Sequence, residues 1–132
     1  MKIYFCGSMT CGREKQENYE QIINYLKNFG TILNEFVADK VVKDYEPSKV
    51  FKRDYTNMKN ADICIADISV PSTGVGFELG MMYNLNVKTL VLYDENMKEP
   101  SSLPRGADKF EVKSYKTIEE EKDIINNFIE NL

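Results

Sequence analysis

The stretch Pro71–Gly80, with the sequence P-S-T-G-V-G-F-E-L-G, follows an apolar run that ends at Asp67. That run, Ile63–Ala66, has the length and composition of a buried strand, and residues 81–85 continue at helical spacing. The order predicts a strand, a glycine loop and a helix. Loop glycines leave backbone N–H groups free to face a ligand, and the helix points its positive end the same way. We therefore expect an anion site here, beside the carboxylate of Glu78 in the first turn of this helix.

Short apolar runs and helical patterns alternate along the rest of the chain. Strands are expected at 2–7, 31–33, 61–68, 88–93 and 109–112, and helices at 14–28, at 47–60, after the glycine loop and after Thr117. Ser48 is expected to cap the second helix, and Thr117 and Glu120 to form a capping box before the last helix. Residues 34–45 and 94–106 are expected to be irregular.

The alternation of strands and helices predicts an α/β fold with a parallel sheet covered on both faces. The strongest apolar runs are the first, third and fourth, which favours a five-stranded sheet in the order 2-1-3-4-5. The expected architecture is thus one doubly wound, flavodoxin-like or Rossmann-like domain over residues 1–132.

The composition excludes several kinds of site and partner. The chain has 132 residues, a net charge of -4, no histidine, and three cysteines without C-x-x-C spacing. The lack of histidine excludes a Ser-His-Asp triad and most zinc sites, and the acidic balance argues against a nucleic-acid polymer as partner. No apolar stretch approaches the roughly 20 residues of a membrane span, and no signal-peptide core is present. We expect a cytoplasmic protein with reduced cysteines.

In a sheet of this order, the ligand lies beyond the carboxyl ends of the strands, at the switch point between the first and third. Tyr4, near the end of the first strand, and Glu78, just past the third, are expected to be neighbours there. A tyrosine hydroxyl bonded to the carboxylate would orient it and hold it ionised. Each residue also has an ordinary explanation, because acids are common near helix starts and tyrosines in cores. The residues alone leave both interpretations open.

Seven segments of the chain resemble the 2'-deoxynucleoside 5'-phosphate N-hydrolases of the nucleoside 2-deoxyribosyltransferase superfamily. The similarity covers nearly the whole chain, and its segments are Tyr4–Ser8, Gly12–Glu14, Phe29–Leu33, Asp54, Ala61–Ile63, Pro71–Gly80 and Arg105–Ala107. The resemblance implies a hydrolase that cleaves the N-glycosidic bond of 2'-deoxynucleoside 5'-monophosphates. The products would be the free base and 2-deoxyribose 5-phosphate, and the resemblance implies that neither a metal nor an organic cofactor is needed.

The resemblance also implies a role for each matching residue. Glu78 would be the nucleophile that forms a glycosyl-enzyme ester at C1', Tyr4 would position it, and Asp54 would orient the substrate and manage the proton that the departing base needs. Ser101 would reach the phosphate from the neighbouring subunit of a homodimer. The full set of implied binding residues is Ser72, Gly74, Gly76 and Ser101 for the phosphate, and Gly7, Ser8 and Met9 for the base.

The chain departs from the family at two places near the expected pocket. Phe36 stands where some members carry a histidine beside the sugar, and Thr10-Cys11 where some have a basic residue and a glycine. Base preference and sugar preference are therefore left open.

Two other functions are also left open: transfer of the deoxyribosyl group from Glu78 to another base, and a nucleotide-binding module without turnover. The phosphate-suited serines favour hydrolysis, and the joint presence of the three catalytic candidates favours an enzyme.

Overall fold

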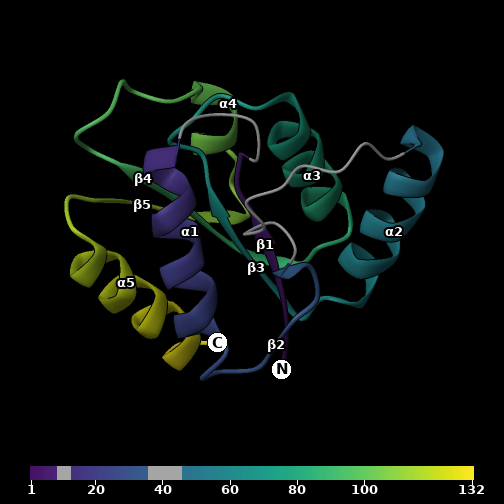
Figure 1. Cartoon of the computed structure of the whole chain (residues 1–132), viewed down its shortest axis with the longest axis horizontal. Helices are drawn as coiled ribbons and strands as arrows, with labels where there is room; N and C mark the ends of the chain where they lie inside the picture. The colour runs from purple at the N-terminus through teal and green to yellow at the C-terminus, as the bar shows by residue number, and fades with distance from the viewer. Residues whose placement is uncertain (9–12, 36–45) are drawn as a thin grey trace.

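The computed structural model describes residues 1–8, 13–35 and 46–132 and contains a parallel five-stranded sheet (Figure 1). The strands are β1 (Lys2–Cys6), β2 (Thr31–Ile32), β3 (Ile63–Asp67), β4 (Lys88–Asp94) and β5 (Phe110–Tyr115). Their order is β2-β1-β3-β4-β5, and all four pairings are parallel. The predicted fold class and strand order are therefore confirmed.

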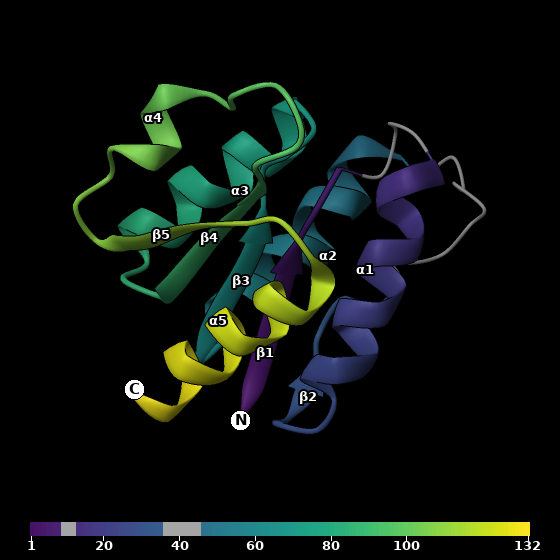
Figure 2. The ribbon, with the colours of Figure 1, turned by 90° about the vertical axis from the view of Figure 1, so that its left-hand side faces the viewer.

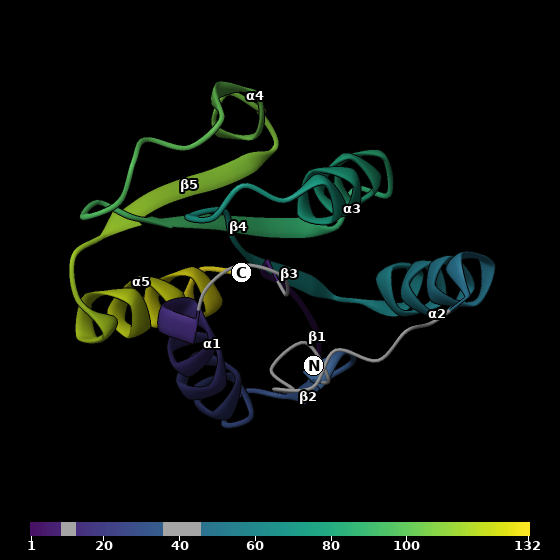
Figure 3. The same ribbon diagram turned by 45° about the horizontal axis from the view of Figure 1, so that its top comes forward.

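Helices cover both faces of this sheet, as the views in Figure 2 and Figure 3 make clear. The helices α1 (Arg13–Leu26) and α5 (Ile118–Glu130) lie on one face, and α2 (Pro47–Asn60) and α3 (Thr73–Asn84) lie on the other. The short helix α4 (Ser102–Arg105) packs beside β5 at the sheet edge. No helix in the described part of the chain has both the length and the apolar character needed to cross a membrane.

The inner strands β1 and β3 have apolar side chains on both faces, which is why they lie inside the sheet and not at its edge. Successive strand residues point to opposite faces. Ile3, Phe5, Ile63 and Ile65 pack toward α1 and α5, whereas Tyr4, Cys6, Cys64 and Ala66 pack toward α2 and α3. The alternation places Tyr4 on the α3 side of the sheet, and this position determines where its hydroxyl can reach.

Helix starts account for most of the differences from the predicted elements. Glu46, not Ser48, occupies the N-cap position of α2, and the Ser48 hydroxyl donates to the Glu46 carboxylate at 3.0 Å. A proline in the first turn already has the φ angle a helix needs, so α2 begins there without a side-chain cap. Thr117 caps α5 as predicted and accepts from the Glu120 amide at 3.2 Å.

Two further differences concern the end of the chain. The carboxylate of Glu120 accepts from the Lys116 amide at 2.8 Å, one residue before the position that a capping box would use. The segment 94–106, expected to be irregular, contains α4.

The predictions for Met9, Thr10-Cys11 and Phe36 concern positions outside the described residues.

Candidate active site

Helix α3 begins earlier than the glycine pattern suggests. Ser72 is its N-cap, and the Ser72 Oγ accepts from the Val75 amide at 3.2 Å. The Gly76 amide already bonds the Ser72 carbonyl at 3.1 Å. The predicted glycine loop is therefore the first turn of a helix, because a capping serine outweighs the low helix propensity of the glycines. Glu78 consequently lies beyond the first turn, not within it as expected.

The contact expected between Tyr4 and Glu78 is present. The Tyr4 hydroxyl donates to Oε2 of Glu78, joining two residues 74 positions apart in the chain. Tyr4 is 1% exposed, so its ring is held by the core and the direction of its hydroxyl is defined. The carboxylate of Glu78 is therefore oriented from the sheet side by a donor that cannot easily turn away.

Burial raises the pKa of Glu78 from 4.5 to about 7. The hydrogen bond from Tyr4 and the charge of Arg53 act against this rise, whereas the charge of Asp54 adds to it. Burial and then the charge of Glu78 raise the pKa of Tyr4 far above its ordinary value, so the tyrosine stays a proton donor. A carboxyl group that titrates near neutral pH is typical of sites that perform acid–base or nucleophilic chemistry.

Asp54 reaches the same place from α2. Its carboxylate accepts from Nε of Arg53 at 3.0 Å, and the side chains of Asp54 and Arg53 are 22% and 33% exposed. Asp54 acts on the titration of both Glu78 and Tyr4, which places three candidate residues from β1, α2 and α3 in one electrostatic group. Arg53 was not predicted as part of this group. The available signal was a cation directly beside Asp54, which is too common on helix surfaces to be specific.

The residues expected near the base are only partly described. An added Cβ at Gly7 would lie 3.0 Å from the rings of Phe5 and Tyr19, so this glycine is required by close packing against α1. Ser8 is 2% exposed, and its hydroxyl has no partner among the described residues. Met9 lies outside those residues.

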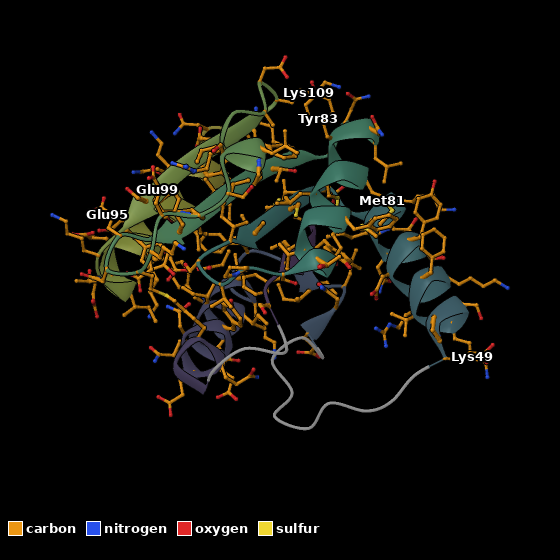
Figure 4. The ribbon with its side chains drawn as sticks, turned by 90° about the horizontal axis from the view of Figure 1, so that it is seen from above. Lys49, Met81, Tyr83, Glu95, Glu99 and Lys109 are labelled. Carbon is orange, nitrogen blue, oxygen red and sulfur yellow. The ribbon has the colours of Figure 1, made fainter. Side chains whose placement is uncertain are left out.

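A cavity of ≈ 1480 Å³ lies on the other flank of α3, toward α4. Its lining includes Ser72, Gly76 and Ser101 from the expected phosphate set, whereas the described lining residues include none of the three catalytic candidates. Figure 4 shows the same division: Met81 lies between α3 and α2, and Tyr83 lies beside Lys109 on the opposite side. Gly74 is exposed in the first turn between these two flanks.

The structure thus gathers the expected site residues in two groups that share the start of α3. The first group faces α2 and contains the carboxylate pair and the tyrosine. The second borders the cavity and contains the hydroxyl groups suited to phosphate. Within residues 1–8, 13–35 and 46–132, no cluster of three or more acidic or cysteine side chains is arranged to hold a metal ion.

Comparisons with known proteins identify relatives of the chain. The family model described as nucleoside 2-deoxyribosyltransferase matches residues 3–127. The chain is 33% identical to the 5-hydroxymethyl-dUMP N-hydrolase of Danio rerio, over 100% of this chain and 98% of that protein. It is 34% identical to the protein of the same name from Homo sapiens, over 86% of this chain and 71% of that one.

Solved structures share the fold. A CMP N-glycosidase from Clostridium botulinum superposes with a TM-score of 0.75 at 20% identity, covering 96% of this chain and 99% of that one. A 2-deoxyribosyltransferase from Bacillus psychrosaccharolyticus superposes with a TM-score of 0.68, also at 20% identity, covering 93% and 91%. Because the family model matches residues 3–127 of this 132-residue chain, the chain belongs to the nucleoside 2-deoxyribosyltransferase family.

Proposed function

We propose that the chain hydrolyses the N-glycosidic bond of 2'-deoxynucleoside 5'-monophosphates. The observation that carries this proposal is the bond from the Tyr4 hydroxyl to Glu78, which orients a carboxylate beside the start of α3. Relatives named 5-hydroxymethyl-dUMP N-hydrolase, at 33% and 34% identity, support the same reaction class. A helix start and nearby serines favour a phosphate at one end of the substrate, and the deoxyribose is inferred from the names of these relatives.

In the first step, an ionised Oε of Glu78 attacks C1' of the deoxyribose. The C1'–N bond breaks, its electron pair stays with the base nitrogen, and the base takes up a proton from solvent water that Asp54 relays. The product is a glycosyl ester of Glu78 and a free base. Deoxyribose lacks the 2'-hydroxyl that would withdraw electrons from C1', so an oxocarbenium-like transition state forms comparatively easily without a histidine.

In the second step, water attacks C1' of the ester. Asp54, left ionised by the first step, accepts a proton from this water, and the C1'–O bond to Glu78 breaks. The products are 2-deoxyribose 5-phosphate and the original carboxylate, so atoms and charge balance over the cycle. Tyr4 keeps its proton throughout and serves as a positioning donor to Glu78.

Binding of the 5'-phosphate supplies energy far from the reacting atom. The first turn of α3 offers amides without intrahelical partners and the positive end of the helix dipole. Ser72 and the backbone around Gly74 are proposed to hold the phosphate, with Gly7, Ser8 and Met9 beside the base. Gly76, whose amide already bonds the Ser72 carbonyl, is proposed to leave open space beside the phosphate. Energy from the phosphate can thus hold C1' against Glu78.

The test is a panel of deoxynucleoside and ribonucleoside monophosphates, including 5-hydroxymethyl-dUMP, assayed for free base by chromatography. Glu78→Gln should abolish base release while still binding the substrate in calorimetry. The matched control is Glu111→Gln, which removes an exposed carboxylate on β5. Normal turnover by Glu78→Gln, or no base release from any substrate by the wild type, would reject the proposal.

Transfer of the deoxyribosyl group to a second base is the alternative that the family description favours. It shares the first step and differs in the acceptor. Adding a second free base to a reaction with a deoxynucleoside monophosphate separates the two, because a new nucleotide forms only by transfer. A tight complex with an uncleaved deoxynucleotide would instead favour a binding module.

We further propose that the enzyme works as a homodimer in which Ser101 reaches the phosphate of the neighbouring subunit. An apolar cavity flank is left open beside α3, where added Cβ atoms at Gly76 and Gly80 would meet nothing within 4 Å. Leu103 on α4 is 84% exposed beside it. A second copy of the chain seated on this flank would cover these apolar groups.

A cytoplasmic location is also proposed. Cys6 and Cys64 are free and buried, with their Sγ atoms 3.6 Å apart, which fits a reducing compartment. Cell fractionation with an antibody against the chain tests this location, and recovery in a membrane or extracellular fraction would contradict it.

A further inference from the structure

A second group of buried polar side chains lies at the carboxyl edge of the sheet, on the face away from Glu78. Its members come from α1, β3, the segment after β3, β4 and β5. They are Lys15, Asp67, Ser69, Asp94 and Tyr115. Lys15, Asp67, Ser69 and Tyr115 are between 0% and 6% exposed, so little water can reach the bonds that they make.

These five residues form a closed ring of hydrogen bonds. Oδ2 of Asp67 accepts from the Tyr115 hydroxyl at 2.5 Å, and the oxygen of that hydroxyl accepts from Nζ of Lys15 at 2.8 Å. Nζ of Lys15 also pairs with Asp94 Oδ2 at 2.9 Å. The Asp94 amide donates to the Ser69 Oγ at 2.9 Å, and the Ser69 amide returns to Asp67 Oδ1 at 2.8 Å.

The ring holds the chain where it leaves β3 for α3. Asp67 is the last residue of β3, and Ser69 lies three positions before Ser72, the N-cap of α3. The Ile68 amide bonds the Leu92 carbonyl at 2.9 Å, so the segment is tied to β4 at consecutive residues. The path to the first turn of α3 is thereby set by bonds made on the opposite face of the sheet.

Stability alone is a poor reason for such a ring. Two carboxylates and one ammonium group lose hydration there, and buried ion pairs of this kind are often no better than apolar side chains of the same size. Burial raises the pKa of Asp67, while the bonds from Tyr115 and Ser69 and the charge of Lys15 oppose that rise. What the ring does supply is a single defined geometry for the segment that it encloses.

We propose that this ring positions the phosphate-binding first turn of α3, with Asp67, Ser69, Lys15 and Tyr115 acting through Ser72. The inference rests on the proposed function for the identity of the ligand. The four residues touch no substrate, and their effect is on where the Ser72 hydroxyl and the first amides of α3 lie. Displacements of about 1 Å at a binding group can cost up to roughly 100-fold in rate, so opening the ring should have a measurable effect on the reaction.

The test compares Ser69→Ala and Tyr115→Phe, each of which removes one hydroxyl from the ring and leaves the packing in place. Thr117→Ala is the matched control, because it removes one helix-capping bond of α5 and no ring member. Each variant is assayed on a deoxynucleoside 5'-monophosphate and on the same deoxynucleoside without phosphate. The ratio of the two kcat/KM values measures how much the phosphate site contributes.

The ring variants should raise KM for the monophosphate by about tenfold with kcat changed by less than about threefold, and leave kcat/KM for the plain deoxynucleoside unchanged. Combining the two substitutions should add little, because either one opens the ring. The control should leave this ratio unchanged. An unchanged ratio in both ring variants would overturn the proposal.

Hydrogen exchange of the backbone amides gives a readout independent of activity. Ser69→Ala and Tyr115→Phe should speed exchange at residues 72–76, whereas Thr117→Ala should not. This measurement decides the matter even if no substrate is hydrolysed, in which case only the proposed function fails. Exchange that rises equally over the whole sheet would identify the ring as a general stabiliser and reject the positioning role.

Discussion

At the scale of single residues, the environment of Glu78 determines when it can act as a nucleophile. Its pKa of about 7, raised mainly by burial, leaves the carboxyl group only partly ionised at neutral pH. Burying the uncharged carboxyl group beside Tyr4 costs less desolvation free energy than burying the carboxylate, and at neutral pH the ionised form is still populated. The site of Tyr4 and Glu78 therefore keeps Glu78 buried and still lets it ionise near neutral pH.

The pH dependence of the reaction follows from this value. Because only the ionised form attacks C1', kcat/KM should rise with pH and level off above about 7, not above 4.5. Tyr4→Phe removes a bond that lowers the pKa of Glu78, so the rising limb should move to higher pH. Initial rates of base release from pH 4 to 10 measure the rising limb in the wild type and in Tyr4→Phe, and a midpoint near 4.5 in the wild type would contradict the assignment.

The contact between side chains that could be predicted from the sequence lies at the switch point of the sheet, where the end of a strand meets a helix. The contact between Tyr4 and Glu78 could be expected because strand order alone brings their elements together. Arg53 could not be expected, since its effect on Glu78 depends on the rotation of α2 about its axis. Spacing along the chain contains no information on that rotation.

At the scale of elements, the contact between α1 and α5 contains a buried acid. Glu121 is 0% exposed, Asn18 Nδ2 donates to its Oε2 at 2.9 Å, and burial raises its pKa to about 8. Among the described residues, Glu121 Oε1 and Asn18 Oδ1 have no hydrogen-bond partner. A proton on the carboxyl group would supply the missing donor, so the neutral acid suits this contact.

Stability should accordingly fall as pH rises through about 8. The folded state holds this proton more tightly than the unfolded chain, so the contribution is full below about 4.5 and is lost above about 8. Glu121→Gln keeps the shape and adds a permanent donor. It should match the wild type at pH 5 and exceed it at pH 9 in urea unfolding, and a deficit at pH 9 would contradict the prediction.

The turn between α1 and β2 depends on Gly30. An added Cβ there would lie 2.1 Å from the Met1 carbonyl oxygen, which itself accepts from the Thr31 amide at 2.9 Å. Gly30→Ala should therefore destabilise the fold by about 2 kcal/mol, since the clash is with backbone that must shift. The control is Gly106→Ala, whose Cβ would come no nearer than 3.4 Å to the Ser102 carbonyl oxygen. Equal unfolding midpoints in urea would refute the clash.

Elements with a long, strongly periodic pattern could be predicted well, and α2 begins and ends where its pattern does. The start of α3 was predicted too late because its glycines were assigned to a loop, whereas the Ser72 cap holds them in a helix. The short helix α4 was missed because four residues are too few to show a period. Local propensity is a weak guide wherever one side-chain bond decides the conformation.

At the scale of the whole molecule, α3 lies between the two groups of site residues, and the proposed substrate contacts both groups. The carboxylates lie toward α2, and the cavity with Ser72 and Ser101 lies toward α4. The strand order could be predicted from hydrophobicity, because only strands buried on both faces can be central. The buried ring could not, because its five members are scattered from position 15 to position 115 and meet only in the finished sheet.

The homodimer makes a testable prediction about which subunit supplies Ser101. Glu78→Gln and Ser101→Ala should each have low activity alone. When they are mixed, dimers that contain one chain of each kind should regain one working site, which joins Glu78 of one subunit to Ser101 of the other. Activity that rises on mixing to about one quarter of the wild-type value supports action across the interface. No rise on mixing, with exchange of subunits verified, would contradict it.

The hydrogen bond between Tyr4 and Glu78 spans 74 positions of the chain. A collapsed chain with helices formed but β1 not yet docked against β3 would contain every reactive group and no nucleophile held in place. Turnover is thus a direct gauge of how many molecules have completed their tertiary structure. During denaturation, loss of product formation should coincide with loss of the sheet core and precede the melting of individual helices.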